Sequence, residues 1–150
     1  MLDKLIALFR DPEADVELTE DDGREAVAAI LVAAARADDD YAASERTQID
    51  RILAARYDLA PSEATTLRES GEQAHAEAGD LVRFTRAIKR AVPHEERIAV
   101  IEAIWEIAYA DGARDAEEAG LVRKLCGLLY VEDREAGLAR QRVAQRLGIS

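Results

Sequence analysis

Apolar residues concentrate in two long segments of the chain, and both patterns predict buried helices. The first segment runs from Ala26 to Ala35, and every residue in it is apolar. The second runs from Ile98 to Ala108 and is apolar on nearly every side of a helix. Because a helix that is apolar all round is normally buried, we predict that these two segments form central helices that pack against each other.

Weaker helical patterns flank these two segments. Apolar residues at i, i+3, i+4 and i+7 predict an amphipathic helix over residues 1–10. The stretch 11–22 has many acidic residues and no basic residue before Arg24, so it reads as a solvated linker. We expect a short or frayed helix over residues 63–75, where Gly71 interrupts the pattern. Further helices are predicted over residues 44–57, 80–92 and 133–147, which makes the chain an all-α, single-domain bundle of about seven helices.

A helix, an acidic turn and a second helix occur twice along the chain. Shifting the sequence by 73 positions places Ala110-Asp111 on Ala37-Asp38, Glu118 on Glu45, and Tyr130 on Tyr57. Such self-similarity indicates an internal duplication. We place the two repeats at about residues 24–57 and 95–130 within one domain that spans residues 1–150.

The doubled pattern resembles a known family. The segments ARADDDYAASERTQIDRIL and AYADGARDAEEAGLVRKLCGLL are similar to the TerB family of tellurite-resistance-B-like proteins. The same domain type occurs in the N-terminal cytosolic part of DjlA-type co-chaperones. The resemblance covers roughly residues 22 to 148, although the first segment has Asp39 where the second has Gly112. It implies an all-helical fold, a divalent-metal-binding acidic site, no well-defined reaction, and a setting in tellurite or other metal stress.

The acidic turns supply the candidate metal ligands. Carboxylates clustered on a turn suit hard cations such as Ca²⁺, Mg²⁺ or Mn²⁺. An EF-hand is excluded, because its sixth and twelfth positions fall on Ala43 and Ile49 in the first turn, and on Ala116 and Val122 in the second. We hypothesise that the two turns meet across a pseudo-twofold axis. The predicted ligands are Asp38, Asp40, Glu45, Asp111, Asp115 and Glu118.

A purely structural role for these carboxylates stays open. Asp115 and Glu118 have capping-box spacing, and acidic residues in the first turn of a helix also suit its dipole. The alternative function is therefore a metal-free protein–protein interaction module or a co-chaperone-like scaffold. In that case the acidic turns are helix caps and a surface for a protein partner.

Charge and reactive residues narrow the remaining classes. The 150-residue chain has a net charge of −11, which disfavours binding to nucleic acid. A single cysteine, Cys126, excludes an internal disulfide and a thiolate zinc cluster. His75 and His94 belong to no catalytic or metal motif, so we predict that the protein is not an enzyme. We expect a protein partner of unknown identity, and the oligomeric state stays open.

Two further expectations concern location and the last helix. We expect no integral membrane segment and a cytoplasmic protein, because the sequence shows no signal-peptide pattern and its longest apolar run is too short to span a bilayer. The last predicted helix is locally basic, with Arg134, Arg140, Arg142 and Arg146. Either these arginines offset an acidic neighbour within the fold, or they form a surface for an acidic partner.

Overall fold

All regular secondary structure in the described residues is helical. The computed structural model describes residues 3–11, 13, 15, 17–36, 43–77, 86, 89–90, 92–110, 126–127, 129 and 131–148. It contains no strand in these ranges and confirms the predicted all-α fold. The total of about seven helices and the internal duplication stay predictions. The helices are α1 (Asp3–Arg10), α2 (Glu20–Ala35), α3 (Ala43–Tyr57), α4 (Pro61–Glu77), α6 (His94–Ala110) and α8 (Asp133–Arg146).

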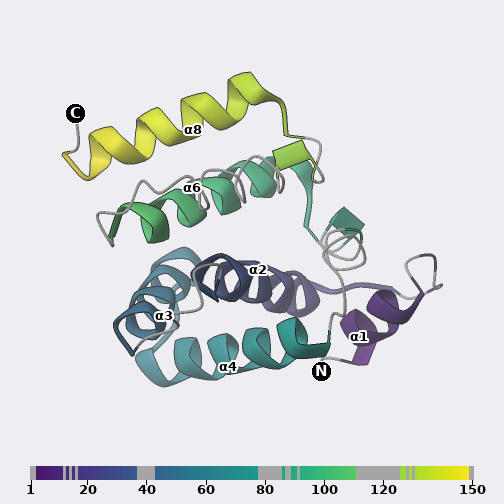
Figure 1. Cartoon of the computed structure of the whole chain (residues 1–150). Coiled ribbons are helices and arrows are strands. Elements are labelled where there is room, and N and C mark those ends of the chain that lie inside the picture. The colour runs from purple at the N-terminus through teal and green to yellow at the C-terminus, as the bar shows by residue number, and fades with distance from the viewer. Residues whose placement is uncertain are drawn as a thin grey trace.

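Helix α2 is the centre of the bundle. It lies between α4 on one side and α6 on the other, and α8 covers the far side of α6 (Figure 1). Each residue from Ala26 to Val32 is at most 1% exposed, which confirms the predicted burial of this segment. Helix α2 does contact α6, as predicted, but its most extensive contact is with α4.

The start of α2 is fixed by a capping box. The Thr19 hydroxyl accepts a hydrogen bond from the Asp22 amide at 3.4 Å, and the Asp22 carboxylate accepts one from the Thr19 amide at 2.8 Å. These two bonds satisfy backbone donors that an uncapped helix leaves open. Because of this cap the helix begins at Glu20, so the linker predicted over residues 11–22 was placed three residues too long.

Helix α4 differs from the short, frayed helix that we predicted. It runs unbroken through Gly71, which is buried against α2. A Cβ atom at this position would lie 2.6 Å from the carbonyl carbon of Ala28 and 2.8 Å from the amide nitrogen of Ala29. Gly71 therefore marks the point where two helix backbones approach closely. The prediction was wrong because it treated this glycine as a helix breaker.

Helices α3 and α4 are joined by a polar network on their shared flank. The Arg68 guanidinium contacts the Asp50 carboxylate at 2.6 Å and the Glu72 carboxylate at 3.0 Å. The Thr65 hydroxyl donates to the second oxygen of Asp50 at 2.9 Å. The side chain of Arg68 is only 12% exposed, so this network is shielded from solvent more than an ordinary surface ion pair.

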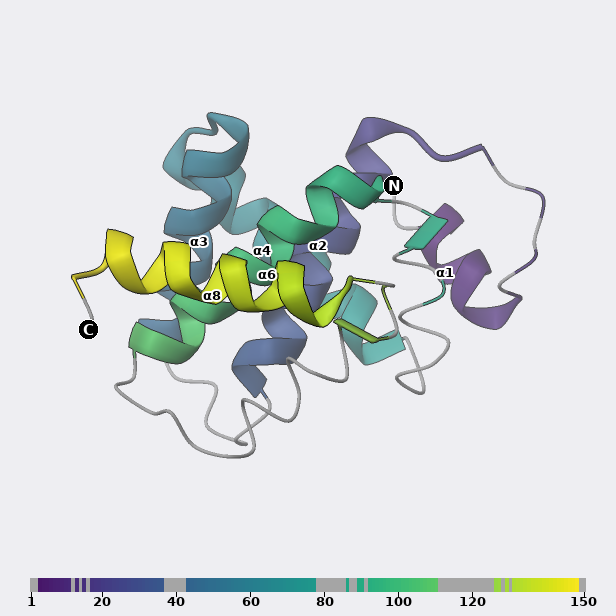
Figure 2. The ribbon, with the colours of Figure 1, turned by 90° about the horizontal axis from the view of Figure 1, so that it is seen from above.

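Helices α6 and α8 run parallel with their like ends side by side (Figures 1 and 2). His94 and Glu135 face each other near the start of the two helices. Near their ends, Arg142 and Arg146 contact Glu102, and Arg146 also contacts Glu106. The guanidinium of Arg140 lies 4.9 Å from the centre of the Trp105 ring. These contacts support the view that the arginines of the last helix offset an acidic neighbour.

The same contacts show why α6 is less buried than its sequence suggested. Its Ile98 and Trp105 side chains are only partly buried, whereas Ile101 and Ile104 are at most 2% exposed. Glu102 and Glu106 lie on the face that α8 covers with arginines. One face of α6 therefore packs on α2 and another makes ion pairs.

Among the described side chains of the N-terminal helix, Leu8 and Ile6 pack on the bundle. Leu8 is fully buried, and Ile6 packs against the core at partial burial. Helix α1 contacts α4 and α2. The predicted helix over residues 1–10 is thus confirmed from Asp3 onward. Most of the helix predicted over residues 80–92 lies outside the described residues.

His75 on α4 makes the stability of the bundle depend on pH. Burial lowers the pKa of His75 below its ordinary value of 6.5, and the positive charge of Arg36 lowers it further. The folded protein therefore binds this proton less readily than the unfolded chain does. The resulting stability is complete above pH 6.5 and is lost as the pH falls through 6.5 toward the lowered pKa.

We expect the free energy of unfolding to fall with decreasing pH in that window, and we expect His75→Gln to make the fall shallower. Urea denaturation at closely spaced pH values between about 5 and 8 measures both curves. Curves with the same slope for the wild-type protein and the variant would contradict this assignment.

Candidate functional site

The predicted metal ligands fall mostly outside the part of the chain that the structure describes. Asp38, Asp40, Asp111, Asp115 and Glu118 all lie outside it. Glu45 is described: it occupies the first turn of α3, and its residue surface is 5% exposed. A carboxylate in the first turn of a helix is favoured by the helix dipole.

A hydrogen bond joins α3, the helix that follows the first acidic turn, to α6, the helix that precedes the second. The side-chain amide of Gln48 in α3 donates a hydrogen bond to the backbone carbonyl of Glu106 in α6 at 3.1 Å. Gln48 lies one helical turn after Glu45, and Glu106 lies one turn before Ala110, the last residue of α6. The C-terminal ends of α2 and α6 lie on the same side of the molecule (Figure 2).

Two described carboxylates of this region already have cationic neighbours. Glu102 and Glu106 contact Arg142 and Arg146 of α8. Over the described ranges, no group of three or more His, Cys, Asp or Glu side chains is placed to hold a metal ion. A metal at this end would therefore need ligands from residues 37–42 or 111–125.

Two reactive side chains that the structure describes, Cys126 and His94, do not form a catalytic pair. Burial raises the pKa of the Cys126 thiol to about 11, and the charge of Asp133 raises it further. The thiol is therefore protonated at neutral pH and a poor nucleophile. His94 lies 3.7 Å from the carboxylate of Glu135 on an exposed edge of the α6–α8 pair. A protonated thiol and an isolated surface ion pair do not supply a nucleophile with a general base.

Comparison with known families identifies the domain. The sequence model described as tellurite resistance protein TerB matches residues 24–141, from the first turns of α2 into α8. The chain belongs to the TerB family. This confirms the resemblance seen in the two acidic segments, and the match includes all six predicted ligands. No curated protein and no solved structure that was compared matches the chain.

None of the helices in the described residues is both long and apolar enough to cross a lipid bilayer.

Sequence reasoning missed a second group of polar side chains in this TerB domain. Arg24, Tyr57 and Arg97 come from three different helices and make the contacts described below. Arg24 precedes a run of alanines, and Arg97 lies in a charged first turn, so neither stands out in the sequence. A helical pattern indicates which face is buried. It gives no information about which side chains from separate helices meet.

Proposed function

We propose that this TerB-family protein is a non-enzymatic component of the response to tellurite or other metal stress, and that it binds one divalent cation between its two acidic turns. The cation would be Ca²⁺, Mg²⁺ or Mn²⁺. The hydrogen bond between Gln48 and Glu106 carries the proposal, because it holds the start of α3 against the end of α6. Ligands from both turns then lie within reach of one ion.

The chemistry of the donors suits a hard cation. Glu45 supplies carboxylate oxygens beside the first turn, and Asp38, Asp40, Asp111, Asp115 and Glu118 are carboxylates as well. Oxygen-only donor sets favour Ca²⁺, Mg²⁺ and Mn²⁺ over softer metals. A thiolate site is disfavoured, because the chain's one cysteine, Cys126, is buried and its pKa is raised.

The positions of the helices are consistent with a duplication that places the two turns symmetrically. The interval from the start of α2 to the start of α6 is nearly equal to the interval from the start of α4 to the start of α8. Both intervals lie within one residue of the 73-residue shift that relates the two segments of the sequence. Helix α4 packs on α2, and α8 packs on α6, so each central helix has a partner helix at the corresponding place in the repeat. In this proposal a pseudo-twofold axis relates the two turns.

The experiment is a thermal melt of EDTA-stripped protein titrated with Ca²⁺, Mg²⁺, Mn²⁺ and Zn²⁺. Free cation at about a hundred times its dissociation constant adds roughly 2.7 kcal/mol to the free energy of unfolding. For a domain of this size, that corresponds to a rise in the melting temperature of roughly 5–10 °C. We expect such a rise with one of the first three ions, and we expect the double variant Asp111→Asn/Glu118→Gln to lose it.

Two further variants make the result specific. Glu45→Gln tests whether the first turn contributes ligands, and we expect it to reduce the cation response. Glu13→Gln/Glu17→Gln removes two exposed carboxylates from the linker, and we expect it to retain the full response. Melting curves that no cation shifts would instead favour the metal-free interaction module. In that case Asp111→Asn/Glu118→Gln would lower stability by about 1–2 kcal/mol, as the loss of a helix cap does, whatever cation is present.

A further inference from the structure

A cleft of about 590 Å³ lies at the N-terminal ends of α2 and α6. It is formed by the start of α2, the end of α3, and residues that lead into α6 or lie in its first turn. Leu18 and Pro93 give it an apolar surface, and the neighbouring Val92 is almost fully buried. Its volume falls within the range of pockets that hold small organic ligands. The site is independent of the proposed cation site, because no predicted metal ligand lines it.

The wall of the cleft before α6 is held by one side chain. The guanidinium of Arg97 donates hydrogen bonds to the carbonyl oxygens of Lys89 at 2.7 Å, Val92 at 3.0 Å and Leu129 at 3.1 Å. These bonds fix the backbone from which Lys89 and Arg90 extend. A binding site gains affinity when its polar groups are positioned before the ligand arrives.

The opposite wall of the cleft carries Tyr57, and two arginines lie close to its ring. Arg24 lies 4.8 Å and Arg56 lies 5.5 Å from the centre of the Tyr57 ring. Arg56 also donates a hydrogen bond to the Tyr57 hydroxyl oxygen at 3.2 Å. Burial raises the pKa of Tyr57, so this hydroxyl keeps its proton at neutral pH. Since the oxygen accepts from Arg56, the hydroxyl hydrogen can be donated to an acceptor in the cleft.

The net charge of the described side chains that line the cleft is opposite in sign to the net charge of the protein. Among the described residues that line the cleft, Arg24, Lys89 and Arg90 provide three positive charges, and Glu20 and Glu96, both exposed, provide two negative charges. This described lining is thus net positive in a chain whose net charge is −11. Helices α2 and α6 both begin at the cleft, and the partial positive charge of a helix N-terminus adds to this local field.

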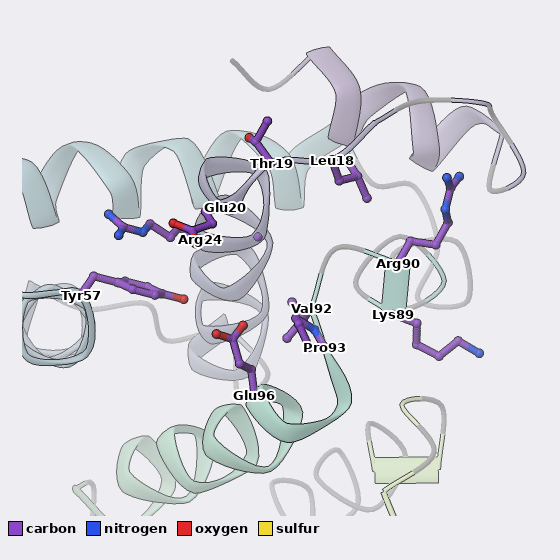
Figure 3. A pocket seen from close by; sticks show the side chains of 11 residues that line it. Leu18, Thr19, Glu20, Arg24, Tyr57, Lys89, Arg90, Val92, Pro93 and Glu96 are labelled. Carbon is purple, nitrogen blue, oxygen red and sulfur yellow. The ribbon is translucent and has the colours of Figure 1, made fainter.

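The cleft is polarised along its length (Figure 3). Lys89 and Arg90 lie on one side of Val92 and Pro93, whereas Arg24 and Tyr57 lie on the other side. A ligand that spans the cleft would therefore meet cations, then an apolar surface, then a hydroxyl donor. Glu96, which points toward Tyr57, places negative charge at the second side and disfavours an anionic group there.

We propose that this cleft binds a small organic anion with a phosphate or carboxylate group. The anionic group contacts Lys89 and Arg90, and an apolar part of the ligand covers Leu18 and Pro93. An oxygen or nitrogen acceptor at the far end of the ligand accepts the hydrogen of the Tyr57 hydroxyl.

The test uses three simple probes and excludes divalent cations. Phenyl phosphate and benzoate carry the same ring with different anionic groups, and benzyl alcohol carries the ring without a charge. Each is titrated into the full-length, ¹⁵N-labelled protein in EDTA, and amide shifts are followed by NMR. We expect saturable shifts at residues such as Leu18, Arg24 and Val92 with at least one anion, and about tenfold weaker binding of benzyl alcohol. The stronger of the two anions identifies phosphate or carboxylate as the preferred group.

A matched pair of variants separates a site from general charge. Lys89→Gln/Arg90→Gln is expected to weaken binding of the preferred anion about tenfold. Arg51→Gln/Arg134→Gln removes two positive charges from exposed positions outside the cleft, and it is expected to change the affinity less than about twofold. The proposal is overturned if neither anion gives saturable shifts at the cleft, if benzyl alcohol binds as tightly as the anions, or if both double variants lose affinity equally. Because EDTA removes divalent cations, none of these outcomes depends on the proposed cation site.

Discussion

Replacing Gly71 with alanine is expected to lower the free energy of unfolding by about 2 kcal/mol or more. The added methyl group would lie 2.6 Å from the carbonyl carbon of Ala28 and 2.8 Å from its Cβ. Helix backbone cannot rotate away as a flexible side chain can, so α2 and α4 must separate. The higher helix propensity of alanine returns only about 1 kcal/mol. Urea denaturation monitored by circular dichroism measures the difference.

Gly137 in α8 provides the matched control. It lies inside a helix as Gly71 does, but it is exposed, and a Cβ atom there would have no neighbouring atom within 4 Å. Gly137→Ala is therefore expected to raise the free energy of unfolding by about 0.5–1 kcal/mol through helix propensity alone. The two substitutions are chemically identical and should have opposite signs. If Gly71→Ala were as stable as the wild-type protein or more so, the close approach of α2 and α4 would be wrong.

Gly71 also shows how far the helices could be predicted from the sequence. The all-apolar run from Ala26 to Ala35 is a local signal, and it was sufficient to predict a buried helix. The capping box of Thr19 and Asp22 that starts this helix lies inside the segment predicted as a linker. A glycine that permits helix contact has the same local sequence as one that breaks a helix. Only the neighbouring backbone, far away in the sequence, distinguishes the two cases.

The second long apolar segment was predicted less accurately for a related reason. Its apolar pattern indicated burial on all sides, yet Ile98 and Trp105 are partly buried. Glu102 and Glu106 interrupt the pattern, and their contacts with Arg142 and Arg146 lie 40 residues away in the sequence. A single sequence does not reveal which charged residues of distant helices will meet, although the basic last helix did suggest an acidic neighbour.

The candidate sites differ in the same way. The acidic turns were visible because their residues are close together in the sequence and recur after 73 positions. The cleft at the other end of α2 takes Arg24, Tyr57 and Arg90 from segments that share no pattern. Its net positive lining is also concealed by the acidic composition of the whole chain. The sequence repeat was therefore sufficient to propose the acidic turns as a site. The cleft could be found only from the packing of the helices.

Arg97→Met is expected to lower the free energy of unfolding by about 3 kcal/mol. One guanidinium group joins the carbonyl oxygens of Lys89, Val92 and Leu129, at 2.7, 3.0 and 3.1 Å. Hydrogen bonds from a charged donor each contribute about 1.5–3 kcal/mol, but methionine keeps much of the apolar packing of the arginine stem. The loss should therefore come from the three carbonyls, which connect α6 to the segments before and after it. Arg97→Lys should restore little of it, because one ammonium group does not reproduce the planar fork.

Arg142→Met supplies the comparison for Arg97→Met. Arg142 is also an arginine with a polar partner, but its side chain is 49% exposed and it contacts Glu102 at 3.4 Å. A surface ion pair of this kind contributes at most about 1 kcal/mol, so its loss should be small. Equal losses for the two variants in urea denaturation would show that the three carbonyl contacts add nothing to stability. A loss confined to Arg97→Met would instead show that the wall of the cleft and the core are stabilised by the same side chain. Substitutions of Arg97, which supports the cleft without lining it, would then lower the stability of the fold as well as alter the cleft.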